Sequence, residues 1–303
     1  MEPTAVPHAN RLSLARKLSL RGPATIVALA TLAVGCQSAP HSKPAHPAAV
    51  SLPASVPIAT TPRNWPDTMR FADPLSFVTR SFHLDLDVDF DQSRLRGTAT
   101  LELVRMDPNS RELVLDTRDL QIDSVRVAPA GSEDFRKTRF VLDHRDDELG
   151  SALRIAMPRD AARVRIAYAT TPQASGLQWL PPSQTTGKRS PFLFSQAQAL
   201  HARSMVPLQD TPWIRTTFSA TLRVPDGLVA VMAAESDPAN RRGQTTFRFH
   251  MPQPIPSYLL ALAVGDLEFR AIGPRTGVWA EPSQVEAAAR EFEDAEAMLA
   301  PTE

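Results

Sequence analysis

Four histidines are the residues best suited to bind a metal in this sequence: His83, His144, His201 and His250. A zinc peptidase carries His-Glu-x-x-His on a helix, which brings two imidazoles to one face and adds a glutamate as general base. No histidine here is followed by glutamate, and the four fall at no other familiar ligand spacing. We therefore expect structural or surface roles for these histidines.

Three aspartates at alternate positions, Asp85, Asp87 and Asp89, offer the oxygen ligands that calcium prefers. They alternate with apolar residues, however, and no turn-forming glycine lies among them as a helix-loop-helix calcium site requires. We expect a charged strand surface that faces solvent.

The sequence also contains no Gly-x-Ser-x-Gly nucleophile motif, phosphate-binding loop or dinucleotide fingerprint.

Cys36 is the single cysteine, so the chain forms no internal disulfide and no thiolate zinc site of its own. Basic residues and then a short apolar stretch precede it, as in a secretory signal. The junction at 32–36 resembles a bacterial lipoprotein signal, in which the cysteine is acylated. We expect a signal peptide at 1–35, a membrane anchor on Cys36 and, because Gln37 follows, the periplasmic face of the outer membrane. The alternative is ordinary cleavage nearby, which leaves Cys36 an incidental thiol.

The charge balance, 33 basic against 33 acidic residues, indicates no general attraction to nucleic acid. Prolines recur through residues 36–72 among alanine, serine and threonine, a composition that favours extended polyproline conformations. We expect a semi-rigid tether there, with His41 and His46 solvated.

The elements that position the candidate residues begin with a clear strand, because apolar and polar side chains alternate from Phe82 to Phe90. A turn at 91–93 leads to a second alternating segment at 95–103, which predicts an antiparallel hairpin. Shorter strands are expected at 113–115, 125–127, 139–142, 153–156, 164–168, 217–224, 228–233 and 245–251. This pattern predicts a mainly β fold, with a large antiparallel sheet or sandwich over residues 73–272.

Helical periodicity appears only after Pro282, where apolar residues recur at steps of three and four. Because the first turn of a helix tolerates proline, the segment predicts a helix. The change of period near Gly273 predicts a boundary, so residues 273–303 begin a further domain. We expect the apolar stripe of this helix to lie uncovered and to require a partner. Its residues are Val285, Phe292 and Leu299.

Several distinctive motifs lie between residues 176 and 276. They are Gly-Leu-Gln-Trp-Leu-Pro at 176–181, Phe-Ser-Gln-Ala-Gln-Ala at 194–199, Gln-Asp-Thr-Pro at 209–212, Pro-Ile-Pro-Ser-Tyr-Leu at 254–259 and Ile-Gly-Pro-Arg-Thr at 272–276. Through them the sequence resembles the zinc aminopeptidase family of aminopeptidase N, aminopeptidase B and leukotriene hydrolase. The resemblance covers roughly residues 80–303.

The resemblance implies a saddle-like, mainly antiparallel first domain, followed by the first helix of a thermolysin-like catalytic domain. It also implies that Gln198 hydrogen-bonds a bound peptide near its amino end, which suits a neutral amide that both donates and accepts. Gln196 is expected to be structural or secondary. The alternative for both glutamines is a hydrogen bond to local backbone.

The family's zinc ligands, and its Gly-x-Met-Glu-Asn segment, lie beyond the position that matches Glu303. The resemblance therefore implies zinc and peptide substrates for the complete enzyme, but neither zinc nor peptide hydrolysis for this chain alone. We expect a truncated, lipid-anchored periplasmic aminopeptidase. The alternatives are a β domain that binds peptides or proteins by itself at the membrane, and a nonfunctional fragment that is degraded.

Overall fold

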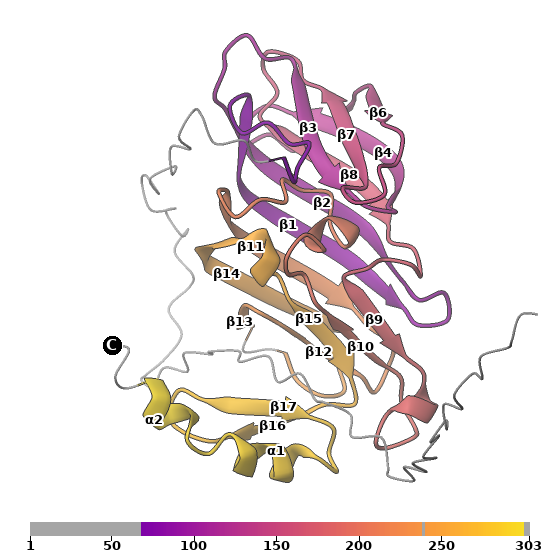
Figure 1. The fold of residues 1–303 in the computed structure, drawn as a ribbon, viewed down its shortest axis with the longest axis vertical. Helices are drawn as coiled ribbons and strands as arrows, with labels where there is room; N and C mark the ends of the chain where they lie inside the picture. The colour runs from indigo at the N-terminus through magenta and orange to yellow at the C-terminus, as the bar shows by residue number, and fades with distance from the viewer. Residues whose placement is uncertain (1–67, 238–239, 300–303) are drawn as a thin grey trace, which may run out of the picture.

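The computed structural model of the chain describes residues 68–237 and 240–299. β-Strands dominate it, and two short α-helices lie at its C-terminal end (Figure 1). The prediction of a mainly β fold is confirmed. The predicted signal peptide, Cys36 and the tether up to residue 67 lie outside the described residues. Within the described ranges, no helix is both long and apolar enough to span a bilayer.

The largest sheet has eight strands, and the expected hairpin lies at its centre. In spatial order the strands are β13 (Glu235–Ser236), β14 (Thr246–Pro256), β11 (Arg215–Arg223), β1 (Phe77–Asp89), β2 (Arg94–Arg105), β8 (Arg163–Ala169), β4 (Gln121–Ala128) and β5 (Arg136–Lys137). One neighbouring pair, β1 with β11, is parallel, whereas the other pairs of this sheet are antiparallel. The parallel pair is possible because a long stretch of chain separates the two strands.

The β1 and β2 hairpin shows why the alternating pattern was informative. Leu84 and Leu86 point into the core with 1% and 0% of their surface exposed. Gly97 of β2 lies opposite Leu86 in the register. A Cβ atom at Gly97 would approach the carbonyl oxygen of Asp85 to 1.9 Å, so only glycine fits this close approach of the two backbones.

Three smaller sheets accompany the large one. The four-stranded sheet consists of β12 (Val229–Met232), β15 (Leu262–Gly265), β10 (Phe192–Ser195) and β9 (Leu177–Leu180). The three-stranded sheet consists of β3 (Glu112–Thr117), β7 (Ser151–Ala156) and β6 (Phe140–Leu142). The two-stranded hairpin consists of β16 (Glu268–Ala271) and β17 (Gly277–Ala280). Short 3₁₀ turns are η1 (Pro182–Gln184), η2 (Ala202–Ser204) and η3 (Ser257–Leu259). The sequence analysis missed β9, β10, β15, β16 and β17, because four residues show too little alternation to distinguish a strand from a loop.

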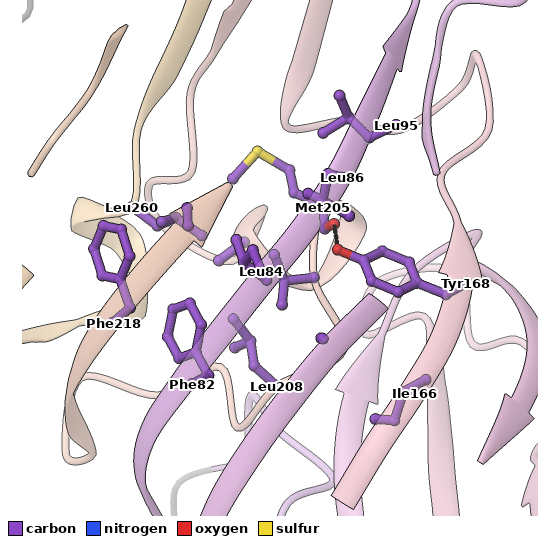
Figure 2. Close-up of a cluster of buried hydrophobic side chains, with 14 of the residues drawn as sticks. Phe82, Leu84, Leu86, Leu95, Ile166, Tyr168, Met205, Leu208, Phe218 and Leu260 are labelled. Carbon is purple, nitrogen blue, oxygen red and sulfur yellow. Dashed lines mark hydrogen bonds between the residues drawn. The ribbon is translucent and has the colours of Figure 1, made fainter. Parts of the chain in front are cut away.

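The core lies on the inner face of the large sheet, where leucine, isoleucine and phenylalanine side chains gather (Figure 2). The rings of Phe82 and Phe218 stack with centroids 5.3 Å apart and join the parallel strands β1 and β11. Tyr168 of β8 is fully buried, and its hydroxyl donates a hydrogen bond of 3.0 Å to the carbonyl of Met205 (Figure 2). This bond fixes the segment after η2 against the sheet.

The C-terminal segment differs from the single helix that the sequence predicts. It forms two short helices, α1 (Val285–Glu291) and α2 (Ala295–Leu299). The carboxylate of Glu296 accepts hydrogen bonds from Arg275 Nε at 2.7 Å and Thr276 Oγ1 at 3.1 Å, which holds α2 against the turn between β16 and β17.

The apolar stripe of this segment is also less exposed to solvent than the sequence predicts. Val285 is 94% shielded and α1 packs on the hairpin of β16 and β17, so the expectation of an uncovered face is wrong at Val285. The predicted domain boundary at residue 273 falls in the turn of this hairpin and stays a prediction.

Candidate functional site

The two candidate glutamines, Gln196 and Gln198, follow directly after β10, and both are exposed. The backbone N–H of Gln198 donates to the side-chain oxygen Oε1 of Gln196 at 3.1 Å, so the amide of Gln196 makes a local structural contact. The peptide bond between Gln198 and Ala199 is cis. Across the described part of the chain, no group hydrogen-bonds the side-chain amide of Gln198. Its exposed amide is therefore available to a ligand.

The loop that carries Gln198 is held at both ends by backbone hydrogen bonds. The N–H of Gln196 donates to the carbonyl of Gly176 at 2.9 Å, next to β9. The N–H of His201 donates to the carbonyl of Ala197 at 2.9 Å, and Ala197 is buried. An exposed side chain on a buried, bonded backbone keeps its position better than one on a free loop.

Side chains beneath the loop complete this frame. Ser204 Oγ accepts from the N–H of Gly176 at 2.8 Å and donates to the carbonyl of His201 at 2.7 Å. His201 Nδ1 hydrogen-bonds Ser175 Oγ at 2.8 Å, and burial, helped by the positive charge of Arg118, lowers the pKa of His201. A Cβ atom at Gly176 would lie 2.7 Å from the carbonyl oxygen of His201, so glycine permits this contact.

A fully buried arginine, Arg203, anchors the loop to the rest of the domain. Its Nε donates to Asp210 Oδ2 at 3.0 Å, and neither side chain is more than 1% exposed. Its Nη1 donates to the carbonyl of Leu149 at 2.9 Å and its Nη2 to the carbonyl of Met69 at 2.8 Å. One guanidinium thus joins the nearby Asp210 to two segments that are distant in sequence.

A second buried carboxylate, Asp116 of β3, extends this network. It accepts from the N–H groups of Phe71 at 2.6 Å and Asp210 at 2.9 Å. Burial raises the pKa of Asp116, and the nearby charge of Arg203 opposes the rise. Asp210 Oδ1 also accepts from Ser257 Oγ at 2.6 Å. The sequence analysis missed this network, because a buried arginine breaks the apolar pattern on which a core prediction depends.

The candidate metal ligands do not converge. His83 Nδ1 hydrogen-bonds Ser219 Oγ at 2.8 Å, and burial lowers its pKa. Asp85 and Asp87 both form ion pairs with Arg223 of the neighbouring strand, so the predicted charged strand face is confirmed. Over residues 68–237 and 240–299, no three histidine, cysteine or acidic side chains gather as a metal site would need.

Sequence comparison gives a family match and many relatives. The peptidase M1 N-terminal domain matches residues 78–259. The chain is 38% identical over 245 residues to leukotriene A-4 hydrolase of Xenopus laevis, which covers 77% of this chain and 39% of that protein. It is 38% identical over 227 residues to leucine aminopeptidase 2 of Pyricularia oryzae, over 72% of this chain and 36% of that protein. The chain thus spans less than half the length of these relatives.

Solved structures agree with the sequence matches. Yeast LTA4 hydrolase in complex with bestatin is 34% identical with a TM-score of 0.68, over 77% of this chain and 36% of that one. An M1 zinc metallopeptidase from Deinococcus radiodurans is 23% identical with a TM-score of 0.53, over 69% of this chain and 48% of that one. The second likeness concerns the fold alone.

Proposed function

The chain belongs to the peptidase M1 N-terminal domain family, and from this premise we propose that it is the substrate-binding β domain of a zinc aminopeptidase that removes N-terminal residues from peptides. The observation that carries the proposal is the exposed amide of Gln198 on a loop whose backbone is buried and hydrogen-bonded. A relative of the chain is named leucine aminopeptidase 2, which supports peptides as the substrate class.

Gln198 supplies a group that suits one peptide unit. Its amide nitrogen donates to a peptide carbonyl and its amide oxygen accepts from a peptide N–H, so it orients the substrate without a charge. Gln196 positions Gln198 by accepting its backbone N–H. Neither glutamine moves a proton or attacks a bond, so both are binding residues rather than catalytic ones.

The zinc chemistry requires residues that these 303 positions do not include. The motif His-Glu-x-x-His does not occur in the sequence. In the part of the chain that the structure describes, His83 and His201 each bond to a serine, His144 lies in a loop and His250 on β14. No three candidate ligands gather there, so the donor set does not fit a zinc ion. We assign no hydrolytic step to this chain and propose that it is inactive by itself.

The test of Gln198 uses an enzyme in which this domain is joined to a catalytic domain of the same family. Gln198→Ala should lower kcat/KM for dipeptide substrates by about tenfold or more, mainly through KM, because both hydrogen bonds of the side-chain amide to the substrate are lost. Gln92→Ala is the matched control, since Gln92 is an exposed glutamine in the turn after β1. Equal kinetics for the Gln198→Ala enzyme and the parent would remove Gln198 from the substrate site.

The location of the protein is a separate proposal. Cys36 is acylated and forms the new N-terminus when residues 1–35 are removed, and the mature protein is anchored at the periplasmic face of the outer membrane. The basic and apolar pattern before Cys36 supports it. Radiolabelled palmitate should enter the parent chain but not Cys36→Ser. Equal labelling of both, or labelling of neither, would reject the anchor and leave ordinary cleavage near Cys36 as the explanation.

A further inference from the structure

The strand β9 forms an edge of the four-stranded sheet, and among the described residues no strand lies beyond it. Its neighbour on the inner side is β10, and its register pairs Leu177 with Ser195 and Trp179 with Leu193. No other described element packs beside β9 to a comparable extent. The outer edge of a strand carries backbone donors and acceptors that can pair with another chain.

The register shows which backbone groups of β9 point outward. The N–H of Gln196 donates to the carbonyl of Gly176, so Gly176 lies in a hydrogen-bonded pair with β10. Antiparallel neighbours alternate between hydrogen-bonded and non-bonded pairs, so Gln178 and Leu180 also bond to β10. Leu177 and Trp179 therefore direct their backbone groups away from the sheet.

Leu177 and Trp179 direct four backbone groups outward, and three of the four make no hydrogen bond to other described residues. The N–H of Leu177 is used, because it donates to the carbonyl of Ala174 at 3.0 Å. The carbonyl of Leu177 and both backbone groups of Trp179 have no bond with other described residues. They lie within two residues of one another and on the same edge, which matches the repeat of an extended chain.

Four of the other edges in the described part of the chain, those of β3, β5, β13 and β6, are less suited to pairing. The edge of β3 is occupied by Leu208, whose carbonyl accepts from the N–H of Asp116 at 2.7 Å. β5 and β13 have two residues each. β6 is longer, but charged residues flank it on both sides at Arg139 and Asp143, an arrangement that protects edges from pairing.

We propose that the outer edge of β9 binds an extended peptide segment, which adds a fifth strand to the four-stranded sheet. The peptide residue opposite Trp179 exchanges two backbone hydrogen bonds with it, and a second peptide N–H forms the third bond by donating to the carbonyl of Leu177. This site goes beyond the proposed contact of Gln198 with a substrate, because it needs neither zinc nor a catalytic domain.

The side chains of β9 set the preferred peptide. Leu177 is buried and Trp179 half-buried on one face, where the ring of Trp179 meets Phe90 edge-on at 5.3 Å. Gln178 on the other face is exposed. An added strand continues both faces, so a peptide with alternating apolar and polar residues fits best.

The experiment measures amide hydrogen exchange at single residues of the purified full chain by NMR. The probe is the blocked hexapeptide Thr-Val-Thr-Val-Thr-Val at about 1 mM, a concentration that detects weak binding. The expected result is exchange of the Trp179 amide slowed by about tenfold or more. The same peptide with every backbone nitrogen methylated keeps its side chains but has no N–H to donate, and it should give no protection.

Two variants of one residue isolate the backbone donor. Trp179→Pro removes the outward N–H, which an edge strand tolerates because that group makes no bond to β10. Trp179→Val removes the same ring but keeps the N–H. The valine variant should retain peptide-induced shifts of neighbouring β9 resonances, and the proline variant should lose them.

Three results would overturn the proposal. The first is an unchanged exchange rate at the Trp179 amide with the unmodified peptide. The second is equal protection by the methylated peptide, which would indicate side-chain association rather than strand pairing. The third is protection of the Phe140 and Leu142 amides of β6 in place of β9. If the proline variant does not fold, the comparison of the two peptides on the parent chain still decides the question.

Discussion

Replacing Arg203 by methionine removes the guanidinium from the buried network but keeps most of the side-chain volume. Asp210 then loses its charged partner at 3.0 Å, and the carbonyls of Leu149 and Met69 lose a donor at 2.9 and 2.8 Å. Asp116 remains fully buried nearby. The variant thus leaves two buried carboxylates without the cation that offsets their charge.

The magnitude follows from this burial. Removing one partner of a buried ion pair costs about 3–5 kcal/mol, because the other charge stays away from water. A domain is stable by about 5–15 kcal/mol, so Arg203→Met should remove a large part of the stability of the β domain. The matched control is Arg223→Met. Arg223 is 40% exposed and pairs with Asp85 and Asp87 at the surface, so its loss should cost less than about 1 kcal/mol.

The cost should also depend on pH. Burial raises the pKa of Asp116 above its ordinary value of 3.8, and Arg203 opposes the rise. Without Arg203 the folded-state pKa rises further, so the native state binds a proton more tightly than the unfolded chain does. Stability is then regained as pH falls through the folded-state pKa towards the ordinary value of 3.8, so the loss in Arg203→Met should be smaller at acid pH than at neutral pH.

Urea unfolding followed by tryptophan fluorescence gives the free energy of unfolding for the parent and both variants. Equal losses for Arg203→Met and Arg223→Met, or a loss in Arg203→Met below about 1 kcal/mol, would refute the reasoning. Such a result would mean that the buried network does not hold the loop of Gln198.

Two further changes test the fold at other places. Gly97→Ala should destabilise the domain by about as much as a severe core substitution, on the order of several kcal/mol. The reason is that the new Cβ would meet the Asp85 carbonyl oxygen at 1.9 Å. An unfolding midpoint equal to that of the parent would contradict this. Glu281→Ala should speed amide exchange at Thr186 and Gly187, because their N–H groups donate to the Glu281 carboxylate at 2.8 and 3.1 Å. The free energy of unfolding should change by less than about 1 kcal/mol. Unchanged exchange at both amides would show that this contact does not order the loop.

The sequence predicted the long strands of the fold because their side chains alternate. Leu84 and Leu86 of β1 mark a buried face, and the same pattern on β2 fixes the hairpin. The parallel pairing of β1 with β11 was not predictable, because alternation reports which face is buried and not which strand lies alongside. The contact that holds α2, between Glu296 and its distant partner Arg275, is one that helical periodicity does not register.

The candidate site was predictable only in part. The family resemblance identified Gln198 and Gln196, and the structure shows that one amide is used locally while the other is exposed. The supporting residues had no such signal. Arg203 lies in the short turn η2 and Asp210 in the loop after it, and only their tertiary contacts reveal that these polar residues are buried.

The central proposal is that this chain is the β domain of a zinc enzyme, and that the zinc ligands of the complete enzyme lie outside these 303 positions. The most direct measurement is the zinc content and aminopeptidase activity of the purified chain, with a panel of aminoacyl substrates and a chelator control. The account predicts no stoichiometric zinc and no chelator-sensitive turnover. One zinc per chain with turnover that a chelator abolishes would contradict it, and would show that histidines such as His83 or His201 form a metal site.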